Sequence, residues 1–490
     1  MPKSMPRLAA LCVMALTACL AGCMVGPNYQ RPTVATAPAF KEAPPASTAA
    51  SDGWKPGQPA DQQLKGDWWR MYQDPQLDSL EAQVDAANES LKMAEANFRA
   101  ARAAIGIARS SEAPTIGASP SVGTVRESAN QPYFLTNLAN NGTGNFVLPL
   151  DTSYEIDLWG RIRRGVTQAR AQMQASAADV ATVQLSLHAE LAMDYFGLRS
   201  ADAQEKLLDD TIHAYEFSLK LTQQRLDDGL ALQSDVSQAE TQLSEAEVQR
   251  SDVEVQRAQY EHAIAVLIGK PPAEFALPPD PINAQGPQLP QIPGMLPSQL
   301  LERRPDIAGD ERRMAAANEE IGIAEAAWYP TLSLNAILGM QGTSALNWFT
   351  WPSRFWAVGP TFSETLFDGG RRRAVSRQAR AAYDATVANY RQTTLTAFQQ
   401  VEDNLAALRI LEKEARQQHH ATASALETQS IFQQRYEGGL ELYLPVVIAE
   451  TTALSNQRND IEIMRRRLDA SVLLIKALGG GWKAAQLPKT

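Results

Sequence analysis

Residues 160–229 decide the fold of this chain, and they read GRIRRGVTQARAQMQASAADVATVQLSLHAELAMDYFGLRSADAQEKLLDDTIHAYEFSLKLTQQRLDDG. From Arg161 to Gln223 the stretch contains no proline, and its only glycines are Gly165 and Gly197. A helix rises about 1.5 Å per residue, so the stretch predicts one helix roughly 100 Å long. One stripe recurs at alternating intervals of four and three residues, as in a coiled coil: Leu208, Ile212, Tyr215, Leu219, Thr222 and Leu226. We therefore expect this helix to pack lengthwise against other helices.

The chain contains this segment twice. The shift that places Gly160 on Gly370, here called the long-helix offset, also superimposes the later landmarks without a gap: Arg225 on Arg435, Gly229 on Gly439 and Gly269 on Gly479. An earlier pair of segments follows a slightly larger shift, the short-helix offset, which places Ile105–Ala108 on Ile321–Ala324. Two similar halves are therefore expected to form one body, and the six-residue difference between the two offsets is expected in a loop.

Shorter helices are predicted before and after each long helix. The long helices are expected over 161–226 and 371–436, and the shorter ones over 74–113, 232–268, 306–327 and 442–478. Asp74 followed by Pro75 is typical of a helix start. Pro114 and Pro330 end the first helix of each half and open an extended segment.

Four extended segments lie between the helices, at 115–125, 143–158, 331–340 and 355–367. Alternate residues of the second segment are apolar, and the residues between them are mostly polar, which indicates a strand with two unlike faces. The apolar set is Phe146, Leu148, Leu150, Thr152, Tyr154, Ile156 and Leu158, and its counterparts in the fourth segment are Trp356, Val358, Pro360 and Phe362. Glu364, at the position of Tyr154, breaks the alternation in the fourth segment. A half-buried strand of a soluble sheet has the same alternation. The aromatic residues Trp159, Phe355 and Trp356 at the segment ends favour a sheet that faces lipid.

Four strands are too few to close a membrane barrel, because the smallest such barrels have about eight. An open strand edge is not tolerated in lipid. Several copies of the chain are therefore expected to share one barrel.

Residues 1–22 are predicted to be a secretory signal. Lys3 and Arg7 precede an apolar run at 8–20 that is too short to stay in a bilayer, and the run closes on LAGC at 20–23. The LAGC sequence resembles the lipobox of bacterial lipoproteins, in which the cysteine is diacylated, becomes the new N-terminus and is acylated again. An ordinary signal cut near Ala21 is the alternative. Several acyl chains on Cys23 would anchor the protein stably, where a single one would not.

The composition argues against several classes of function. The net charge of −10, without a basic domain, makes nucleic acid an unexpected partner. Cys12 and Cys19 leave with the signal, so Cys23 alone remains and no disulfide is expected. The glycine run at 479–481 lacks the Gly-Lys-Ser/Thr of a nucleotide-binding loop and is interpreted as a helix stop. His419 and His420 could hold a metal, but neighbours point to different sides of a helix, so we expect a solvated helix face there instead. No cofactor and no enzyme activity are predicted.

Six stretches of the chain are distinctive: CMVGPNYQRP at 23–32, WWRMY at 68–72, DPQL at 74–77, DLWGR at 157–161, LLERRPDI at 300–307 and FDGGR at 367–371. Together they resemble the landmarks of the outer-membrane efflux lipoproteins, the OprM and NodT type within the TolC superfamily. The resemblance covers nearly the whole chain after the signal. It implies an α+β membrane protein, a TolC-like trimeric duct built from two internal repeats. Its 12-stranded outer-membrane β-barrel, with four strands per chain, would continue into a long periplasmic α-helical barrel.

The expected organisation follows from these features. It is a signal peptide at 1–22, a lipidated tether at 23–73, a first repeat at 74–270, a linker at 271–297 and a second repeat at 298–490. The resemblance implies the exit duct of a tripartite efflux pump, which passively conducts drugs or other small toxic compounds from the periplasm to the exterior. Its partners would be two further copies, a periplasmic adaptor (membrane fusion protein), an inner-membrane pump of the RND type and outer-membrane lipid. The alternatives are a TolC-type duct for protein secretion and a periplasmic coiled-coil lipoprotein or adaptor without a pore.

Two turns carry a predicted docking motif at the helix ends farthest from the membrane. Each turn has an arginine four residues before a Gly-Leu pair. The residues are Arg225, Gly229 and Leu230 in the first turn and Arg435, Gly439 and Leu440 in the second. A left-handed glycine that reverses the chain accounts for the glycines alone. The repeated arginine and leucine resemble the family's tip motif for docking the adaptor.

A gate is predicted just after the second turn. Members of the family usually place a leucine ring and then an aspartate ring around the axis there. Leu444 fits the leucine, and Ile448 stands in place of the aspartate. Glu450 lies about 200° further around the helix than Ile448, so it faces away and is no substitute. Closure by apolar packing of Leu444 and Ile448 across the axis is expected, and packing of both residues between helices of one wall is the alternative.

Overall fold

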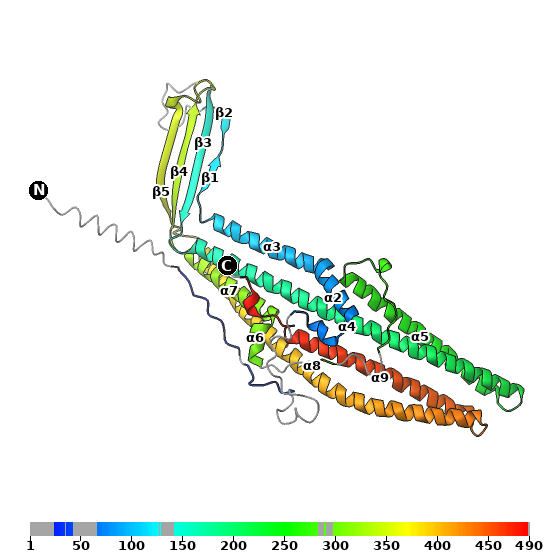
Figure 1. Ribbon diagram of the computed structural model, residues 1–490. Coiled ribbons are helices and arrows are strands. Elements are labelled where there is room, and N and C mark those ends of the chain that lie inside the picture. Colours follow the sequence, from blue (N-terminus) through cyan, green and yellow to red (C-terminus); the bar gives the residue numbers. More distant parts are fainter. Residues whose placement is uncertain are drawn as a thin grey trace.

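The computed structural model describes residues 24–34, 36–42, 66–126, 128, 142–282, 289–290 and 297–488. The predicted signal peptide and Cys23 lie outside these residues. The described chain is elongated, with an antiparallel sheet at one end and helices that run away from it (Figure 1). Two hairpins of long helices reach the end farthest from the sheet.

The two hairpins have the same dimensions. Helix α4 (Arg161–Asp227) and helix α8 (Arg371–Glu437) contain 67 residues each. Each turns back into a helix of 35 residues, α5 (Gln233–Leu267) or α9 (Tyr443–Ala477). The first and last residues of α8 and α9 are those of α4 and α5 shifted by the long-helix offset. The spacing seen in the sequence therefore recurs in the helices. All eight bounds agree with the predicted ones within one residue.

The helix predicted over 74–113 is interrupted, so that prediction was wrong. Helix α2 (Pro75–Ala87) and helix α3 (Glu89–Ser110) are separated by Asn88, whose backbone is extended. The Asn88 side-chain oxygen accepts a hydrogen bond from the Leu91 amide at 3.0 Å, and its Nδ2 donates to the backbone oxygen of Leu267 at 2.8 Å. The break therefore lies beside the end of α5. Asn88 supplies hydrogen-bond partners for an amide at the start of α3 and for a carbonyl at the end of α5.

The second half repeats this junction with a different residue. Helix α6 (Leu300–Arg303) is followed by helix α7 (Pro305–Ala326), whose bounds are those of α3 moved by the short-helix offset. Arg304 stands between them, at the position of Asn88, and donates to the backbone oxygen of Ala477 at 3.1 Å. In each half, the residue that precedes the helix next to the sheet thus donates a hydrogen bond to the last residue of the second helix of the hairpin.

The sheet contains β1 (Thr115–Ala118), β2 (Ser121–Val125), β3 (Thr143–Ile156), β4 (Thr331–Gly342) and β5 (Arg354–Ser363). Its order is β1-β3-β4-β5 with β2 also paired to β3, and all pairs are antiparallel. Strands β1 and β2 share one register on β3, so they are two parts of the predicted segment 115–125. Pro120, which has no amide hydrogen, lies in the interruption between them.

Strand β5 ends four residues before the predicted bound at Phe367. Its last residue, Ser363, lies opposite Thr331, the first residue of β4, so β4 offers no backbone for residues beyond Ser363. Strand β3 lies between two neighbours and continues to Ile156. Within the described chain β5 has a neighbour on one side only. The end of β5 therefore reflects the lack of a second strand beside it.

The register gathers the apolar side chains of all strands on one face of the sheet. Leu150 of β3 lies opposite Leu338 of β4, which in turn lies opposite Trp356 of β5, and all three are exposed. The other face carries mostly polar residues, among them Asp151, Ser153, Glu155, Ser333, Asn335, Gln341 and Thr361. Phe355, expected among the lipid-facing aromatics, pairs with Gly339 on that polar face.

The largest hydrophobic core lies beside the middle of α4. The short helix η1 (Trp68–Tyr72) packs its aromatic rings there against Leu191 and Phe196. The remaining short helices are η3 (Pro272–Glu274), η4 (Pro297–Gln299), η5 (Trp351–Ser353) and η6 (Ala484–Gln486). Among the helices of the described residues, none has both the length and the apolar character that crossing a bilayer requires.

The described part of the predicted tether is extended and lies along the helices. The Val25 amide donates to the backbone oxygen of Trp159 at 3.1 Å, at the base of the sheet. Farther along, the Lys41 amide donates to the carboxylate of Glu402 on α8 at 2.7 Å. Residues 24–42, apart from residue 35, therefore follow the helical body away from the sheet (Figure 1).

Candidate functional site

The two hairpin turns have the same backbone geometry. Gly229 and Gly439 adopt φ angles of 75° and 70°, a region that favours glycine. The amides of Leu230 and Leu440 donate to the backbone oxygens of Arg225 and Arg435, at 2.7 and 2.8 Å. A left-handed glycine followed by such a bond ends each long helix in a Schellman motif. The sequence pattern therefore predicted both turns correctly.

Exposed leucines cover the outer ends of both hairpins. Leu230 and Leu440 extend into solvent immediately after the turn glycines. Leu232 and Leu442, which precede α5 and α9, are exposed as well. Each end thus presents two large, mostly exposed apolar side chains, a feature typical of a surface that another protein covers.

Arg225 is engaged within the chain. Its guanidinium lies over the ring of Tyr436 on α8, with Cζ 4.1 Å from the ring centroid. Its Nη2 donates to the backbone oxygens of Tyr436 and Glu437, at 2.6 and 3.1 Å. These are the last carbonyls of α8, where a positive charge is favoured by the helix dipole and by the aromatic ring. Arg225 therefore joins the end of the first hairpin to the end of the second.

Arg435 has a different environment in spite of its identical motif. Its guanidinium pairs with Glu441 in the same turn at 3.3 Å, and about half of the side chain is exposed. The residue of the first turn at the position of Glu441 is Ala231. Such exposed ion pairs contribute about 1 kcal/mol or less, so little free energy holds the Arg435 guanidinium in place. Of the two arginines, Arg435 is therefore the more exposed and the less firmly held.

The predicted gate residues lie on the exposed side of α9. Leu444 and Ile448 are 60% and 59% exposed, so neither packs between helices of its own chain. Glu450 is only 3% exposed and faces α4, where the hydroxyl of Ser218 is its hydrogen-bond partner. Burial raises the pKa of Glu450 to about 7. Glu450 therefore faces away from Leu444 and Ile448, as the helix geometry predicted.

A polar groove continues the surface that Leu444 and Ile448 begin. Thr451 and Ser455 follow them by seven residues, or about two helical turns, and so lie on the same side of α9. Together with Gln204, Gln249, Gln256, Leu454, Arg458, Asn459 and Glu462 they line a groove of about 460 Å³. The exposed side of α9 therefore changes from apolar to polar with distance from the turn.

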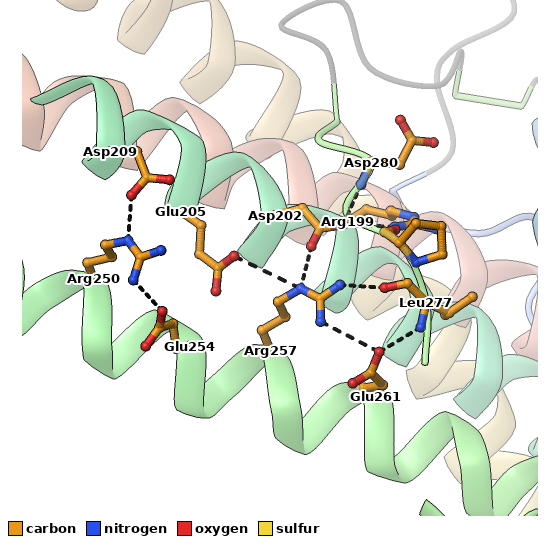
Figure 2. Close-up of polar contacts among 11 residues, drawn as sticks. Arg199, Asp202, Glu205, Asp209, Arg250, Glu254, Arg257, Glu261, Leu277 and Asp280 are labelled. Atoms are coloured by element: carbon orange, nitrogen blue, oxygen red, sulfur yellow. Dashed lines mark hydrogen bonds and ion pairs between the residues drawn. The ribbon is translucent and has the colours of Figure 1, made fainter. Parts of the chain in front are cut away.

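A partly buried polar network, absent from the sequence predictions, binds the linker to the first hairpin (Figure 2). Arg257 of α5 donates to Asp202 of α4 at 2.7 Å and to the backbone oxygen of Leu277 at 2.7 Å. The Leu277 amide donates to Glu261 at 2.7 Å, and the Asp280 amide donates to Asp202 at 2.9 Å. In the sequence, the only signal of this network is the set of opposite charges at 199, 202 and 257. The linker residues that complete the network follow no charge pattern by which they could be identified.

The base of the sheet brings the start of the described chain against an aromatic pair. Trp159 stacks on Tyr329 with ring centroids 4.7 Å apart, and Trp159 Nε1 donates to the backbone oxygen of Pro330 at 2.7 Å. Met24 lies against Gly160, where a Cβ atom would come within 2.6 Å of the Met24 Cγ. Residue 24 is therefore held at the level of the aromatic pair, although the predicted lipidation site itself lies outside the described residues.

Comparisons with known proteins agree with this arrangement. The sequence profile of the outer membrane efflux protein family matches residues 74–270 and 296–480. The probable efflux pump outer membrane protein TtgC of Pseudomonas putida is 32% identical over 478 residues, which cover 96% of each chain. The outer membrane protein OprJ of Pseudomonas aeruginosa is 32% identical over 477 residues, or 96% of this chain and 95% of OprJ. The solved outer-membrane channel OprN superimposes with a TM-score of 0.84 at 28% identity, covering 94% of this chain and 100% of OprN.

Proposed function

The chain belongs to the outer membrane efflux protein family, and from that membership we propose that three copies form the exit duct of a tripartite efflux pump. The duct passively conducts drugs or other small toxic compounds from the periplasm through the outer membrane. The sheet carries this proposal. It has an apolar face of exposed side chains and two edge strands, β1/β2 and β5, that lack outer neighbours in the described chain. Such a sheet is stable in lipid only when further strands close it.

A trimer supplies twelve strands from the four strand positions of each chain, enough for a closed barrel. The apolar face then contacts lipid, and the face with Asp151 and Asn335 lines water. The hairpins continue the barrel into the periplasm, since they extend from the opposite end of the body (Figure 1). In this orientation Leu230 and Leu440 lie farthest from the membrane.

Cys23 carries the lipid anchor in this proposal. Met24 is held beside Gly160 and the Trp159–Tyr329 pair, at the boundary of sheet and helices. Aromatic residues are enriched at that boundary in membrane barrels. Acyl chains on Cys23 therefore begin where the outer-membrane surface meets the protein.

The hairpin ends bind a periplasmic adaptor, which connects the duct to an inner-membrane pump of the RND type. The exposed leucines at 230 and 440 supply apolar contact, and the exposed Arg435 supplies charge. Leu444 and Ile448 close the resting duct by meeting their copies across the axis. Their exposure supports this role to the extent that neither side chain packs between helices of its own chain.

Two measurements on the purified full-length protein test the proposal. Heat-resistant trimers on gels and discrete single-channel currents in planar bilayers are expected. A coiled-coil lipoprotein or adaptor without a pore would give no currents, and that outcome would refute the duct. Restoration of drug resistance in a strain that lacks its own efflux duct, without restoration of protein secretion, separates the efflux duct from a TolC-type secretion duct.

A further inference from the structure

Two sequence motifs without a role in the proposed duct meet at one cavity. The stretch WWRMY at 68–72 forms η1, and the glycine run at 479–481 follows α9. Both line a cavity of about 240 Å³ beside α4. We propose that this cavity binds one N-acetylated amino-sugar unit of a glycan, with the bacterial cell wall as its source. The inference goes beyond the proposed duct, and only the position of the cavity in the periplasm rests on that function.

Three consecutive glycines form one wall of the cavity. Gly479, Gly480 and Gly481 adopt φ angles of 91°, 57° and 93°, a region that favours glycine. A Cβ atom built on Gly480 would collide with the Leu185 side chain of α4, which also lines the cavity. The chain therefore passes the cavity as bare backbone, and this leaves the space open.

The cavity contains a buried hydrogen-bond donor without an acceptor. Trp68 is 1% exposed, and its Nε1 has no hydrogen-bond partner within the described chain. The ring atom bonded to Nε1, Cδ1, lies 3.5 Å from the Cβ position built on Gly480, so this edge of the indole faces the glycine wall. An unpaired buried donor is costly, so a ligand that brings an acceptor to Trp68 is favoured.

Acceptors for hydroxyl groups also line the cavity. The Asp85 Oδ1 atom of α2 accepts from Gln184 at 2.8 Å and lies 3.1 Å from the His188 Nε2 atom. The Asp85 side chain is 42% exposed, and a carboxylate has about four acceptor positions, so Asp85 can accept a further bond. Gln486, which is exposed, adds an amide at the solvent side of the cavity.

These groups select against other classes of ligand. No lysine or arginine is among the residues that line the cavity, and the carboxylates of Asp67 and Asp85 repel anions. A cation would satisfy the carboxylates but would leave the Trp68 donor unpaired. The described residues contain no cluster of three or more groups suited to a metal ion. Drug-sized ligands occupy about 300–1,000 Å³, so the cavity suits a smaller, neutral molecule that has both acceptors and donors.

An N-acetylated hexopyranose meets these requirements. Its acetamido carbonyl oxygen is an acceptor for the Trp68 Nε1 atom, and its hydroxyl groups are donors for Asp85. Trp482, the half-buried residue after the glycines, offers an aromatic ring to the apolar face of the pyranose. The volume of the cavity limits the site to a single sugar unit.

The cavity lies at a level where cell-wall glycan is within reach. His188, one of its lining residues, is about 40 Å along α4 from the first residue of that helix at the base of the sheet. In the proposed orientation this level is in the periplasm, where the cell wall supplies N-acetylated glycan. Lipopolysaccharide also contains amino sugars, but it lies in the outer leaflet, across the membrane from the cavity.

Co-sedimentation of the purified full-length protein with isolated cell-wall sacculi tests the source of the glycan. Displacement by triacetylchitotriose, an oligomer of N-acetylglucosamine, tests the chemistry. Ala181→Leu is expected to abolish binding, because it fills the cavity and removes no hydrogen bond. Trp482→Ala is expected to weaken binding roughly tenfold or more, as truncation of an aromatic anchor does. Ala214→Leu, at an exposed position of the same helix, is the matched control and is expected to bind as the parent does.

Heat-resistant trimers show that each variant folds, and single-channel currents test the duct separately. Glycan binding that fails in the cavity variants while their currents persist would support the site. Failure of the parent to bind both sacculi and triacetylchitotriose, or undiminished binding by both cavity variants, would overturn the site and leave the duct intact. Binding of lipopolysaccharide vesicles and not of sacculi would overturn the cell wall as the source.

Discussion

Arg225 lies over the ring of Tyr436, with its Cζ 4.1 Å from the ring centroid. The Tyr436 hydroxyl is also 3.0 Å from the hydroxyl of Thr222, about one turn before Arg225 on α4. Two side chains of α4 therefore hold the end of α8. This cluster lies only a few residues before the turns that are proposed to bind the adaptor. The residues that hold the two hairpin ends together are therefore neighbours of those proposed to bind the adaptor.

Charge reversal at both turn arginines is expected to abolish efflux. Arg225→Glu with Arg435→Glu places negative charge beside the exposed leucines and at the carbonyl end of α8, which the helix dipole disfavours. Drug susceptibility measures efflux, and heat-resistant trimers in the outer membrane show that assembly is retained. Lys220→Glu, an exposed charge change on the same helix, is the matched control and is expected to preserve resistance. Unchanged resistance in the double variant would refute adaptor docking through these arginines.

Arg225→Ala alone is expected to loosen the hairpin ends. It removes two hydrogen bonds to carbonyls and one contact with an aromatic ring. Charge-assisted bonds of this kind contribute about 1.5–3 kcal/mol each at most. We expect a higher resting conductance in planar bilayers from Arg225→Ala and an unchanged conductance from Arg435→Ala. Equal conductance of both variants would show that Arg225 does not hold the ends together.

Leu444→Ser with Ile448→Ser is expected to open the resting duct. Polar side chains at an apolar constriction admit water, which conducts ions. Resting conductance and sensitivity to vancomycin are expected to rise without loss of trimers. Val248→Ser, which changes an exposed apolar residue of α5, is expected to leave both unchanged. A double variant with the resting conductance and vancomycin sensitivity of the parent protein would show that the gate lies elsewhere.

Glu450→Gln is expected to stabilise the protein at high pH. Burial raises the pKa of Glu450 from its ordinary value of 4.5 to about 7, so the folded chain binds the proton more tightly than the unfolded chain. The contribution of Glu450 to the free energy of unfolding is therefore most favourable below about pH 4.5 and falls by about 3 kcal/mol as the pH rises to about 7. The unfolding temperature of Glu450→Gln relative to the parent is expected to be higher at pH 8 than at pH 4.5. Glu245→Gln, at an exposed position of α5, is expected to show no such difference.

Mass spectrometry of the mature N-terminus tests the lipid anchor. The LAGC close at 20–23 predicts a chain that starts at an acylated Cys23. Met24 follows in place of the aspartate that resembles an inner-membrane retention signal, so transfer to the outer membrane is expected. An unmodified N-terminus downstream of Cys23 would contradict the prediction. Loss of function in Cys23→Ser is a weaker readout, because a chain without the anchor is still able to insert through the proposed barrel.

The sequence by itself determined the features that depend on local periodicity. The absence of proline over 161–223 predicted α4, the long-helix offset predicted α8 and α9, and alternation over 145–158 predicted β3. Asp74 caps α2 as predicted, since its carboxylate accepts bonds from the amides at 76 and 77. These features were readable because the residues that cause each of them are a few positions apart in the chain, or recur in the same order in its second half.

Only the tertiary structure decided features whose causes lie far apart in the sequence. Asn88 interrupts a helical pattern because Leu267, 179 residues later, brings an unpaired carbonyl beside it. Strand β5 stops at Ser363 because β4 begins opposite that residue, at Thr331, and no strand lies on the other side of β5 in the described chain. Arg225 and Arg435 have the same local motif, yet Arg225 reaches Tyr436 and Arg435 binds Glu441. A side chain's role depends on the groups that folding places opposite it, and a local pattern contains no record of those groups.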